Sequence, residues 1–328
     1  MKFISIISKV VIVTALVLGT TSCSDDDDNI ITPPVTLNVV ETAQANTNLS
    51  KLVAALLAAD GDLDTVLSGT GPYTILAPTD TAFDTFLTDN GFNTDLSDVP
   101  TDLLQKILLN HVISGTVRSS DLQSGDGTGY TNTLSTSGPG DTNLSLYYNS
   151  NNGVKFNGVS TVTTADTEAT NGIVHIVDAV IGLPDVTTFV TADPNFSRLL
   201  EGLTAYSFDY VTTLQGNGPF TIFAPNNDAF DALLATDNTW NTPGDIPEAT
   251  LESTLNLHVA SGSNTTESDL TDGEFNTLGG GVLIDATAKT VTDGSDPVIA
   301  STIVSTDVQA ANGVIHVIDK VLLTSIPQ

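Results

Sequence analysis

Four histidines are the side chains in this sequence best suited to acid–base chemistry or to binding a metal ion. Each stands in a motif that occurs twice, and they are His111, His175, His258 and His316. Because imidazole titrates near neutral pH and is a common metal ligand, one pair in each half of the chain would make half of a metal site or an acid–base site. The structural alternative is a buried ring that hydrogen-bonds to backbone groups.

The neighbours of these histidines favour the structural alternative. His111 follows Leu104 and Leu108 on one face of an expected helix. His175 alternates with Ile173 in an expected strand. Both rings therefore point where apolar side chains point, as expected for residues inside a core.

No other pattern predicts a catalytic or metal site. The sequence has neither the Gly-x-Ser-x-Gly turn of many hydrolases nor the His-Glu-x-x-His motif of zinc proteases. Asp60, Asp62 and Asp64 resemble the start of a calcium loop, but Thr65 and Gly71 occupy the positions of its glycine and closing glutamate. The sequence thus predicts no catalytic residue, no metal ligand and no cofactor.

The charge of the chain excludes one class of partner. Its 328 residues include 39 acidic and 9 basic side chains, which gives a net charge of −30. A nucleic-acid-binding protein needs a basic face that displaces counterions from phosphates, so we exclude nucleic acid as a partner. Hydrophobic residues make up 40% of the chain, enough for packed cores.

The N-terminus predicts an export signal. In residues 1–22, Lys2 and Lys9 precede a short apolar run that ends in small residues, which is typical of a signal peptide. A transmembrane anchor is the alternative, but the run has only about half of the ~20 residues that a spanning helix needs. The single cysteine, Cys23, follows the small residues and is a candidate for lipidation. The alternative is an ordinary cleavage site that leaves Cys23 as a free thiol.

Cys23 and its successors resemble the lipidated cysteine and acidic export signal of surface lipoproteins from Bacteroidetes-type bacteria. The residues of this signal are Ser24, Asp25, Asp26, Asp27 and Asp28. Four adjacent carboxylates repel one another, so residues 23–35 are expected to form a solvated tether. The resemblance implies an outer membrane lipoprotein exposed at the cell surface, attached to the membrane only through its N-terminal lipid.

The rest of the chain is one module that occurs twice. Gly71–Leu87 and Gly218–Leu234 share ten of seventeen residues at an offset of 147 (218 − 71). A later block, 169–178, returns at 310–319. An offset of 147 residues is the size of a globular domain and is too long for one solenoid repeat. We therefore predict domains over residues 36–183 and 184–328.

Each copy begins with helical patterns and ends with strand patterns. In the first copy we expect helices after Asn48, Thr79 and Pro100, with one short strand between the first two. From Gly115 onward, short runs rich in β-branched residues alternate with turn residues, and an apolar strand over 172–181 closes the copy. This order predicts an α+β fold.

Three motifs in each copy resemble those of the fasciclin-like domain. They read TILAPTDTAF and TIFAPNNDAF, LLNHVISG and LNLHVASG, and ATNGIVHIVD and AANGVIHVID. The resemblance covers about residues 36–325 and implies two tandem domains, each a wedge or sandwich of strands with helices packed around it. It also implies a role in cell adhesion or matrix attachment without a catalytic apparatus.

The resemblance bears on individual residues as well. Animal relatives have an integrin-linked tyrosine before the first motif histidine, but Asn110 and Leu257 stand there, so that function is not transferred. An adhesion motif of Asp and Ile is echoed by Asp307 and Val308, which makes this pair a candidate adhesion contact. The motif asparagines, Asn171 and Asn312, each precede a glycine and predict a turn before the last strand.

Together these features predict a non-catalytic surface lipoprotein that acts through two fasciclin-like domains. Its expected partners are extracellular matrix, a cell-surface polysaccharide or protein, or a second copy of the chain. The alternative is a protein that binds a metal or small ligand, or an enzyme, that uses the paired histidines.

Overall fold

The computed structural model describes residues 36–93, 95–295, 298 and 300–324. The predicted signal peptide, Cys23 and the export signal at Ser24 and Asp25–Asp28 lie outside this part of the chain. In the described ranges, no helix is both long enough and apolar enough to cross a membrane.

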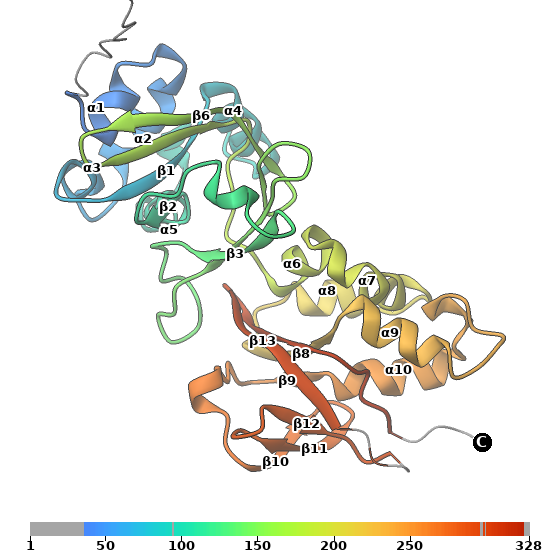
Figure 1. Cartoon of the computed structure of the whole chain (residues 1–328). Helices are drawn as coiled ribbons and strands as arrows, with labels where there is room; N and C mark the ends of the chain where they lie inside the picture. Colours follow the sequence, from blue (N-terminus) through green and yellow to red (C-terminus); the bar gives the residue numbers. More distant parts are fainter. Residues whose placement is uncertain (1–35, 94, 296–297, 299, 325–328) are drawn as a thin grey trace, which may run out of the picture. The chain divides into compact units, whose positions relative to one another are not determined.

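The first domain places short helices around a sheet (Figure 1). Its α-helices are α1 (Val39–Gln44), α2 (Ser50–Ala58), α3 (Leu63–Ser68), α4 (Asp80–Asp89) and α5 (Thr101–Leu109). Its strands are β1 (Tyr73–Pro78), β2 (Val112–Ser114), β3 (Thr128–Asn132), β4 (Ser145–Asn149), β5 (Lys155–Phe156), β6 (Ser160–Ala169) and β7 (Gly172–Val177). Three 3₁₀ turns connect them: η1 (Thr47–Leu49), η2 (Leu96–Asp98) and η3 (Asp121–Gln123).

The second domain repeats this order. Its α-helices are α6 (Val186–Ala192), α7 (Ser197–Thr204), α8 (Tyr210–Leu214), α9 (Asn227–Leu234) and α10 (Glu248–Leu257). Its strands are β8 (Phe220–Pro225), β9 (Val259–Ser261), β10 (Gly273–Thr277), β11 (Gly280–Asp285), β12 (Thr290–Thr292), β13 (Ala300–Ala310) and β14 (Gly313–Ile318). The 3₁₀ turns are η4 (Pro194–Phe196), η5 (Pro243–Asp245) and η6 (Glu267–Asp269). The predicted α+β class is confirmed.

Both sheets have the same topology. The strand order is β2-β1-β7-β6-β5-β4-β3 in the first domain, and β9-β8-β14-β13-β12-β11-β10 is its counterpart in the second. The first strand lies parallel to the last, with Tyr73 opposite Gly172 and Phe220 opposite Gly313. All other neighbours are antiparallel. β1 and β7 are buried along most of their length because both faces of the central strand pair are covered.

The predicted elements differ from the structure mainly at their ends. Thr79 caps α4 as expected, since its hydroxyl accepts a hydrogen bond from the Ala82 amide. The sequence did not predict α1, whose six residues are too few to show a helical period. Asn48 does not cap α2, because the 3₁₀ turn η1 precedes that helix and Asn46 caps the turn. The closing strand ends at Val177 and not at residue 181.

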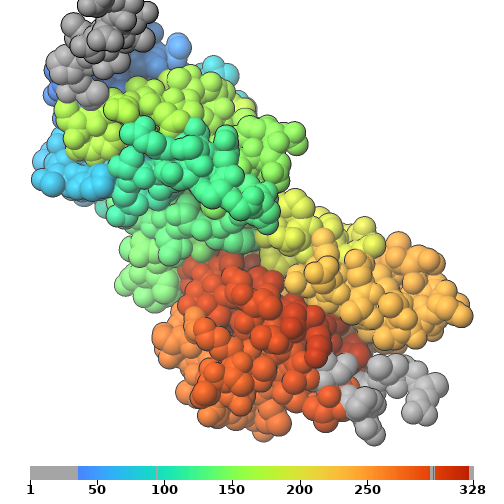
Figure 2. Space-filling model, in the orientation of Figure 1, coloured from blue at the N-terminus to red at the C-terminus, as the bar shows by residue number. Residues whose placement is uncertain are grey.

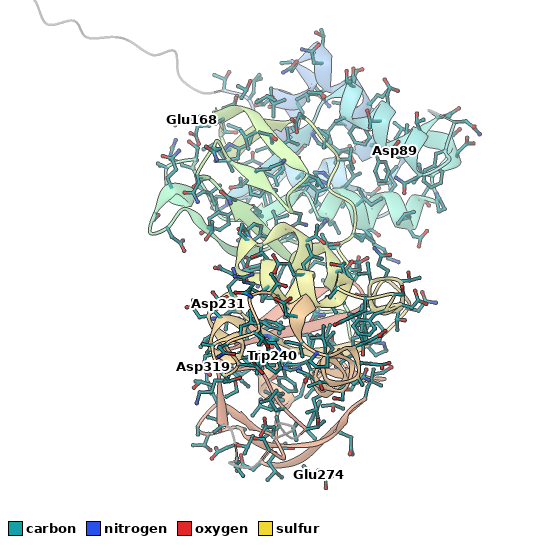
Figure 3. The ribbon with its side chains drawn as sticks, turned by 90° about the vertical axis from the view of Figure 1, so that its right-hand side faces the viewer. Asp89, Glu168, Asp231, Trp240, Glu274 and Asp319 are labelled. Carbon is teal, nitrogen blue, oxygen red and sulfur yellow. The ribbon has the colours of Figure 1, made fainter. Side chains whose placement is uncertain are left out.

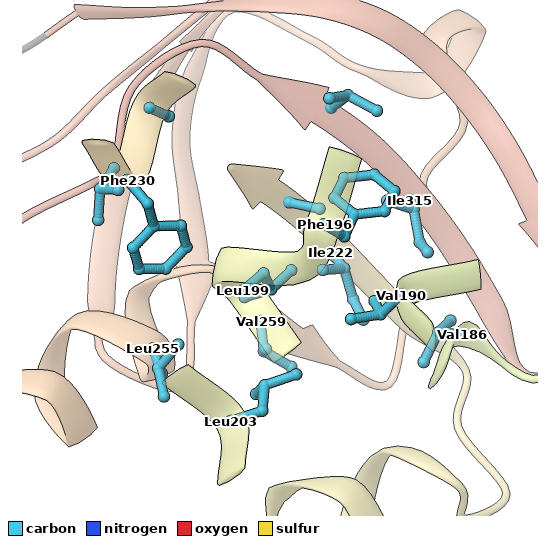
Figure 4. Packing of buried hydrophobic residues seen from close by; sticks show 14 of the residues in the cluster. Val186, Val190, Phe196, Leu199, Leu203, Ile222, Phe230, Leu255, Val259 and Ile315 are labelled. Carbon is cyan, nitrogen blue, oxygen red and sulfur yellow. The ribbon is translucent and has the colours of Figure 1, made fainter. Parts of the chain in front are cut away.

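The helices bury their apolar faces against one side of each sheet. In the second domain, Leu199 and Leu203 of α7 pack with Leu255 of α10 and with Ile222 and Val259 of the sheet (Figure 4). Smaller clusters, centred on Phe156 in the first domain and Val291 in the second, fill the strand-rich ends. Burial of these side chains is the main favourable contribution to folding.

The surface of both domains is rich in carboxylates. Asp89 and Glu168 mark it in the first domain, and Asp231, Glu274 and Asp319 mark it in the second (Figure 3). Figure 2 shows that the residues of each copy gather in a body of their own, from blue to green and from yellow to red. The acidic residues that dominate the composition are exposed on both domains, where water solvates their charged carboxylates.

Hydrogen bonds join the two domains. The Tyr130 hydroxyl of β3 donates to the Asp193 carboxylate, at 2.9 Å. The backbone amide of Gln309 in β13 donates to the Ser145 hydroxyl of β4, also at 2.9 Å. Burial raises the pKa of both Asp193 and Tyr130, because each charged form loses hydration.

Helix α2 offers a direct test of this packing. Leu52 is 3% exposed and Leu57 is 64% exposed on the same helix. We expect Leu52→Ala to lower the free energy of unfolding by about 2–5 kcal/mol, because it removes buried contacts and leaves a cavity. Leu57→Ala should change it by no more than about 0.5 kcal/mol. Urea titration of both variants measures the difference, and equal losses would contradict the assigned orientation of α2.

Candidate functional site

His111 and His258 occupy equivalent positions just after α5 and α10. The Nδ1 atom of His111 lies 2.8 Å from the Ile107 carbonyl, and its Nε2 accepts from the Ile181 amide at 2.8 Å. The ring of His258 repeats this arrangement with the Thr254 carbonyl and the Leu322 amide, at 2.8 and 3.0 Å. Each ring therefore joins the end of a helix to the segment that leaves the last strand.

His175 and His316 lie in the last strands, β7 and β14. The Nε2 of His175 donates to the Val117 carbonyl at 2.8 Å, and its Nδ1 accepts from the Asp166 amide at 3.1 Å. The Nε2 of His316 lies 2.9 Å from the Thr265 carbonyl. Its Nδ1 has no hydrogen-bond partner among the described residues and faces the Asp307 carboxylate at 4.0 Å.

These contacts leave the histidines little capacity for metal or proton chemistry. Three of the four rings use both nitrogens in hydrogen bonds to the backbone. Burial lowers the pKa of His111 and His258 to about 4, since the protonated ring would lose its hydration. In the part of the chain that the structure describes, no group of three or more His, Cys, Asp and Glu side chains is arranged to hold a metal ion.

The motif asparagines do more than form a turn. The Asn171 carbonyl Oδ1 accepts from the Val39 amide at the start of α1, at 2.9 Å. Its Nδ2 donates to the carbonyls of Leu67 and Gly69 at the end of α3, at 2.8 and 2.7 Å. Its backbone carbonyl accepts from Tyr73, at the start of β1.

Asn312 makes the same set of bonds in the second domain. Oδ1 accepts from the Val186 amide of α6 at 2.9 Å. Nδ2 donates to the Leu214 and Gly216 carbonyls at the end of α8, at 2.7 and 2.8 Å. The side chain thus joins the start of one helix to the end of another and satisfies backbone groups that helix ends leave unpaired, while the Asn312 backbone carbonyl accepts from Phe220 at the start of the central strand pair.

The bulge aspartates, Asp166 and Asp307, lie at irregularities in β6 and β13. Both have left-handed backbone conformations, with φ of 58°. Asp166 accepts from the backbone and hydroxyl of Ser119. Asp307 accepts from the Glu267 amide at 2.7 Å. Their first structural task is therefore to hold the loop that follows the second strand of each domain.

The candidate adhesion contact Asp307–Val308 is accessible at only one of its two residues. The carboxylate of Asp307 is 43% exposed, but Val308 is 2% exposed and packs in the core of the second domain. Val308 must be corrected as a contact residue, because successive side chains on a strand point to opposite faces. A partner that binds at this motif would therefore contact Asp307 and the neighbouring Lys289–Glu267 ion pair, and not Val308.

Sequence reasoning missed part of this organisation. It located all four histidines and both asparagines, but not the distant backbone groups that they bind, such as the Val117 carbonyl, 58 residues from His175, and the Val39 amide, 132 residues from Asn171. The repetition of Asn at the same place in both copies was the available signal. An Asn-Gly pair needed only for a turn does not also require a buried side chain, as Asn312 has.

Comparison with known proteins finds one family and several individual proteins that are similar to this chain. The family described as Fasciclin domain matches residues 47–184 and 194–324. The chain is 30% identical over 267 residues to transforming growth factor-beta-induced protein ig-h3 of Sus scrofa, covering 78% of this chain and 35% of that protein. It is 28% identical over 269 residues to human periostin, covering 78% and 29% respectively. The chain thus spans about a third of the length of these relatives.

A solved structure has the same fold. It is a FAS1 domain pair from the insect cell adhesion molecule fasciclin I, with a TM-score of 0.52 and 22% identity. The match covers 85% of this chain and 98% of that chain. The predicted pair of tandem domains is thereby confirmed.

Asn312 can be tested for its role in tying helix ends together. Replacement by alanine leaves one amide and two carbonyls without their partner, and we expect a loss of about 3 kcal/mol in the free energy of unfolding. The matched control is Asn217→Ala, since Asn217 is exposed in the same domain and makes no side-chain hydrogen bond with the described residues. Urea titration that gave similar values for both variants would refute the proposed role.

The buried histidines predict a pH dependence of stability. In the folded protein the pKa of His258 is about 4, whereas the unfolded chain has the ordinary value near 6.5. The unfolded state therefore binds the extra proton first, and stability falls as the pH drops from 6.5 to 4, by about 3 kcal/mol per histidine. His258→Gln should flatten this part of the stability curve. An unchanged slope in the variant would show that His258 is not buried in its neutral form.

Proposed function

Because the chain belongs to the fasciclin domain family, we propose that it is a non-catalytic adhesion protein of the cell surface. The observation that carries this proposal is the match of both copies, residues 47–184 and 194–324, to that family. The solved domain pair with the same fold comes from a molecule described as a cell adhesion molecule. An adhesion role needs exposed surface on a stable scaffold, and no reacting group.

The use of the motif residues supports this proposal over an enzymatic one. The side chains best suited to chemistry, His111 and His258, hydrogen-bond to the backbone through both ring nitrogens and are 2% exposed. A general acid or base must reach a substrate and titrate near the working pH. Rings that are buried, with a pKa near 4, meet neither requirement.

We propose further that the protein is held at the outer membrane by a lipid on Cys23. The four aspartates that follow it, Asp25–Asp28, would keep residues 23–35 extended, because like charges repel. The domains would then project away from the membrane, where matrix proteins, polysaccharides or a second copy of the chain are available. Many anchored copies on one cell would add avidity to weak individual contacts.

The proposal predicts attachment that depends on the anchor. Bacteria that display the full chain should attach to surfaces coated with collagen, with a neutral polysaccharide or with the purified protein more than cells without it. The matched control is Cys23→Ser, which changes one atom and removes the lipidation site. Counting of attached cells should return to background for this variant, because the chain is no longer anchored at the outer membrane.

Two results would contradict the proposal. Equal attachment with and without the displayed chain, on all three coatings, would refute the adhesive role. Resistance of the domains to protease added to intact cells would refute the surface location, since exposed loops would be cut.

A further inference from the structure

The second domain has a groove with aromatic walls on the side of α8 and α10. We call it the aromatic groove, and it has a volume of about 440 Å³. The residues that characterise its lining are Phe208, Asp209, Tyr210, Glu248, Glu252 and Leu278. All of them belong to the second domain, so the groove is complete within one fold.

The aromatic side chains of the groove are held in fixed positions. Phe208 stands between Tyr206 and Tyr210, with ring centroids 5.4 and 5.3 Å apart. The Tyr210 hydroxyl lies 3.0 Å from both the Glu252 carbonyl and the Asn256 side-chain oxygen. The Tyr206 hydroxyl donates to the Ile246 carbonyl at 2.7 Å. Because the rings are tethered in this way, binding a ligand would cost little ordering of the wall.

Three carboxylates surround these rings. Asp209, Glu248 and Glu252 are exposed, and none of them forms an ion pair within the described ranges. No lysine or arginine belongs to the lining. The groove therefore offers aromatic faces and negative charge, which is the combination that attracts a cation.

The equivalent place in the first domain is built differently. At an offset of 147 (206 − 59), Ala59, Gly61 and Leu63 stand where the second domain has its three rings. The same offset places Gln105 opposite Glu252. The Gln105 amide covers Gly61 so closely that a Cβ there would lie 2.5 Å from its Nε2. Asp209 has a counterpart in Asp62, but the rings and the two glutamates occur in only one of the copies, so the scaffold does not require them.

We propose that the aromatic groove binds the ammonium or guanidinium group of a basic segment in a partner protein. The cation would lie against Phe208 and Tyr210 while the carboxylates of Glu248 and Glu252 neutralise its charge. An anionic ligand is disfavoured by three carboxylates, and a neutral sugar would leave their mutual repulsion unrelieved. This inference rests on the proposed function for its setting, since an adhesion protein meets such segments on matrix and cell-surface proteins.

The test is calorimetric titration of the purified full chain with a blocked peptide of alternating glycine and arginine. A glycine-serine peptide of the same length is the ligand control. Two variants separate the groove from the general negative charge of the protein. Phe208→Gly with Tyr210→Leu installs the residues of the first domain and keeps the charge, and Glu248→Gln with Glu252→Gln keeps the rings. We expect roughly tenfold weaker binding of the arginine peptide in each.

The matched control for the charge change is Asp89→Asn with Asp98→Asn. It removes two exposed carboxylates from the first domain and should leave the affinity within about twofold of the unmodified chain. Far-ultraviolet circular dichroism establishes that each variant is folded. The glutamate variants keep the proposal testable if the aromatic pair does not fold, because both glutamates are exposed on α10.

Three outcomes would overturn the inference: no binding to the unmodified chain, equal binding to all variants, or a loss in the Asp89 and Asp98 control as large as in the groove variants. Stronger binding of a neutral oligosaccharide at the same residues would assign the groove to a different ligand. The inference and the adhesive function fail separately. Peptide binding lost in the groove variants supports the groove even if displayed protein gives no attachment, and attachment without peptide binding refutes the groove alone.

Discussion

In each domain the first strand lies parallel to the last, and every other part of the fold depends on this pairing. Tyr73 opposes Gly172 in one copy and Phe220 opposes Gly313 in the other. A parallel pair requires a crossover connection, and in the first domain the crossover contains α4, α5 and the strands β2 to β6. Loop closure of this length is costly in entropy, so the pair must be fixed by strong local interactions at its ends.

The motif residues supply these interactions. Asn171 and Asn312 bind backbone groups where the central pair begins, and His111 and His258 bind those where the chain leaves it. Each buried polar side chain is positioned so that its own donors and acceptors are satisfied by helix ends and loops. Since an unpaired buried amide costs more than its hydrogen bond contributes, these residues specify one arrangement of the helices as well as stabilising it.

The sequence could predict the class of the fold and its duplication because both depend on local patterns. Helical periodicity located α4 and α5, and β-branched runs located β4, β5 and β6. It could not predict that β1 pairs with β7, because pairing across a whole domain leaves no periodic trace. It also could not separate the roles of Asp307 and Val308, because the sequence did not reveal the strand β13, along which these two side chains point to opposite faces. Local chemistry was visible in the sequence, whereas long-range partners were not.

Duplication gives the chain two copies of one scaffold but not two copies of one surface. The motif asparagine and histidines are retained in both copies, whereas the residues at 59–63 and 206–210 differ in size and aromatic content. Buried residues are constrained by several partners at once, while an exposed residue changes at little cost to stability. The net charge of −30 follows the same logic. Many carboxylates hold loops and helix ends, as Asp166 and Asp307 do, but others have side chains that make no hydrogen bond or ion pair with the described residues. A few of them, beside fixed aromatic rings, then suffice to give one domain a preference for a cationic partner that the other domain lacks.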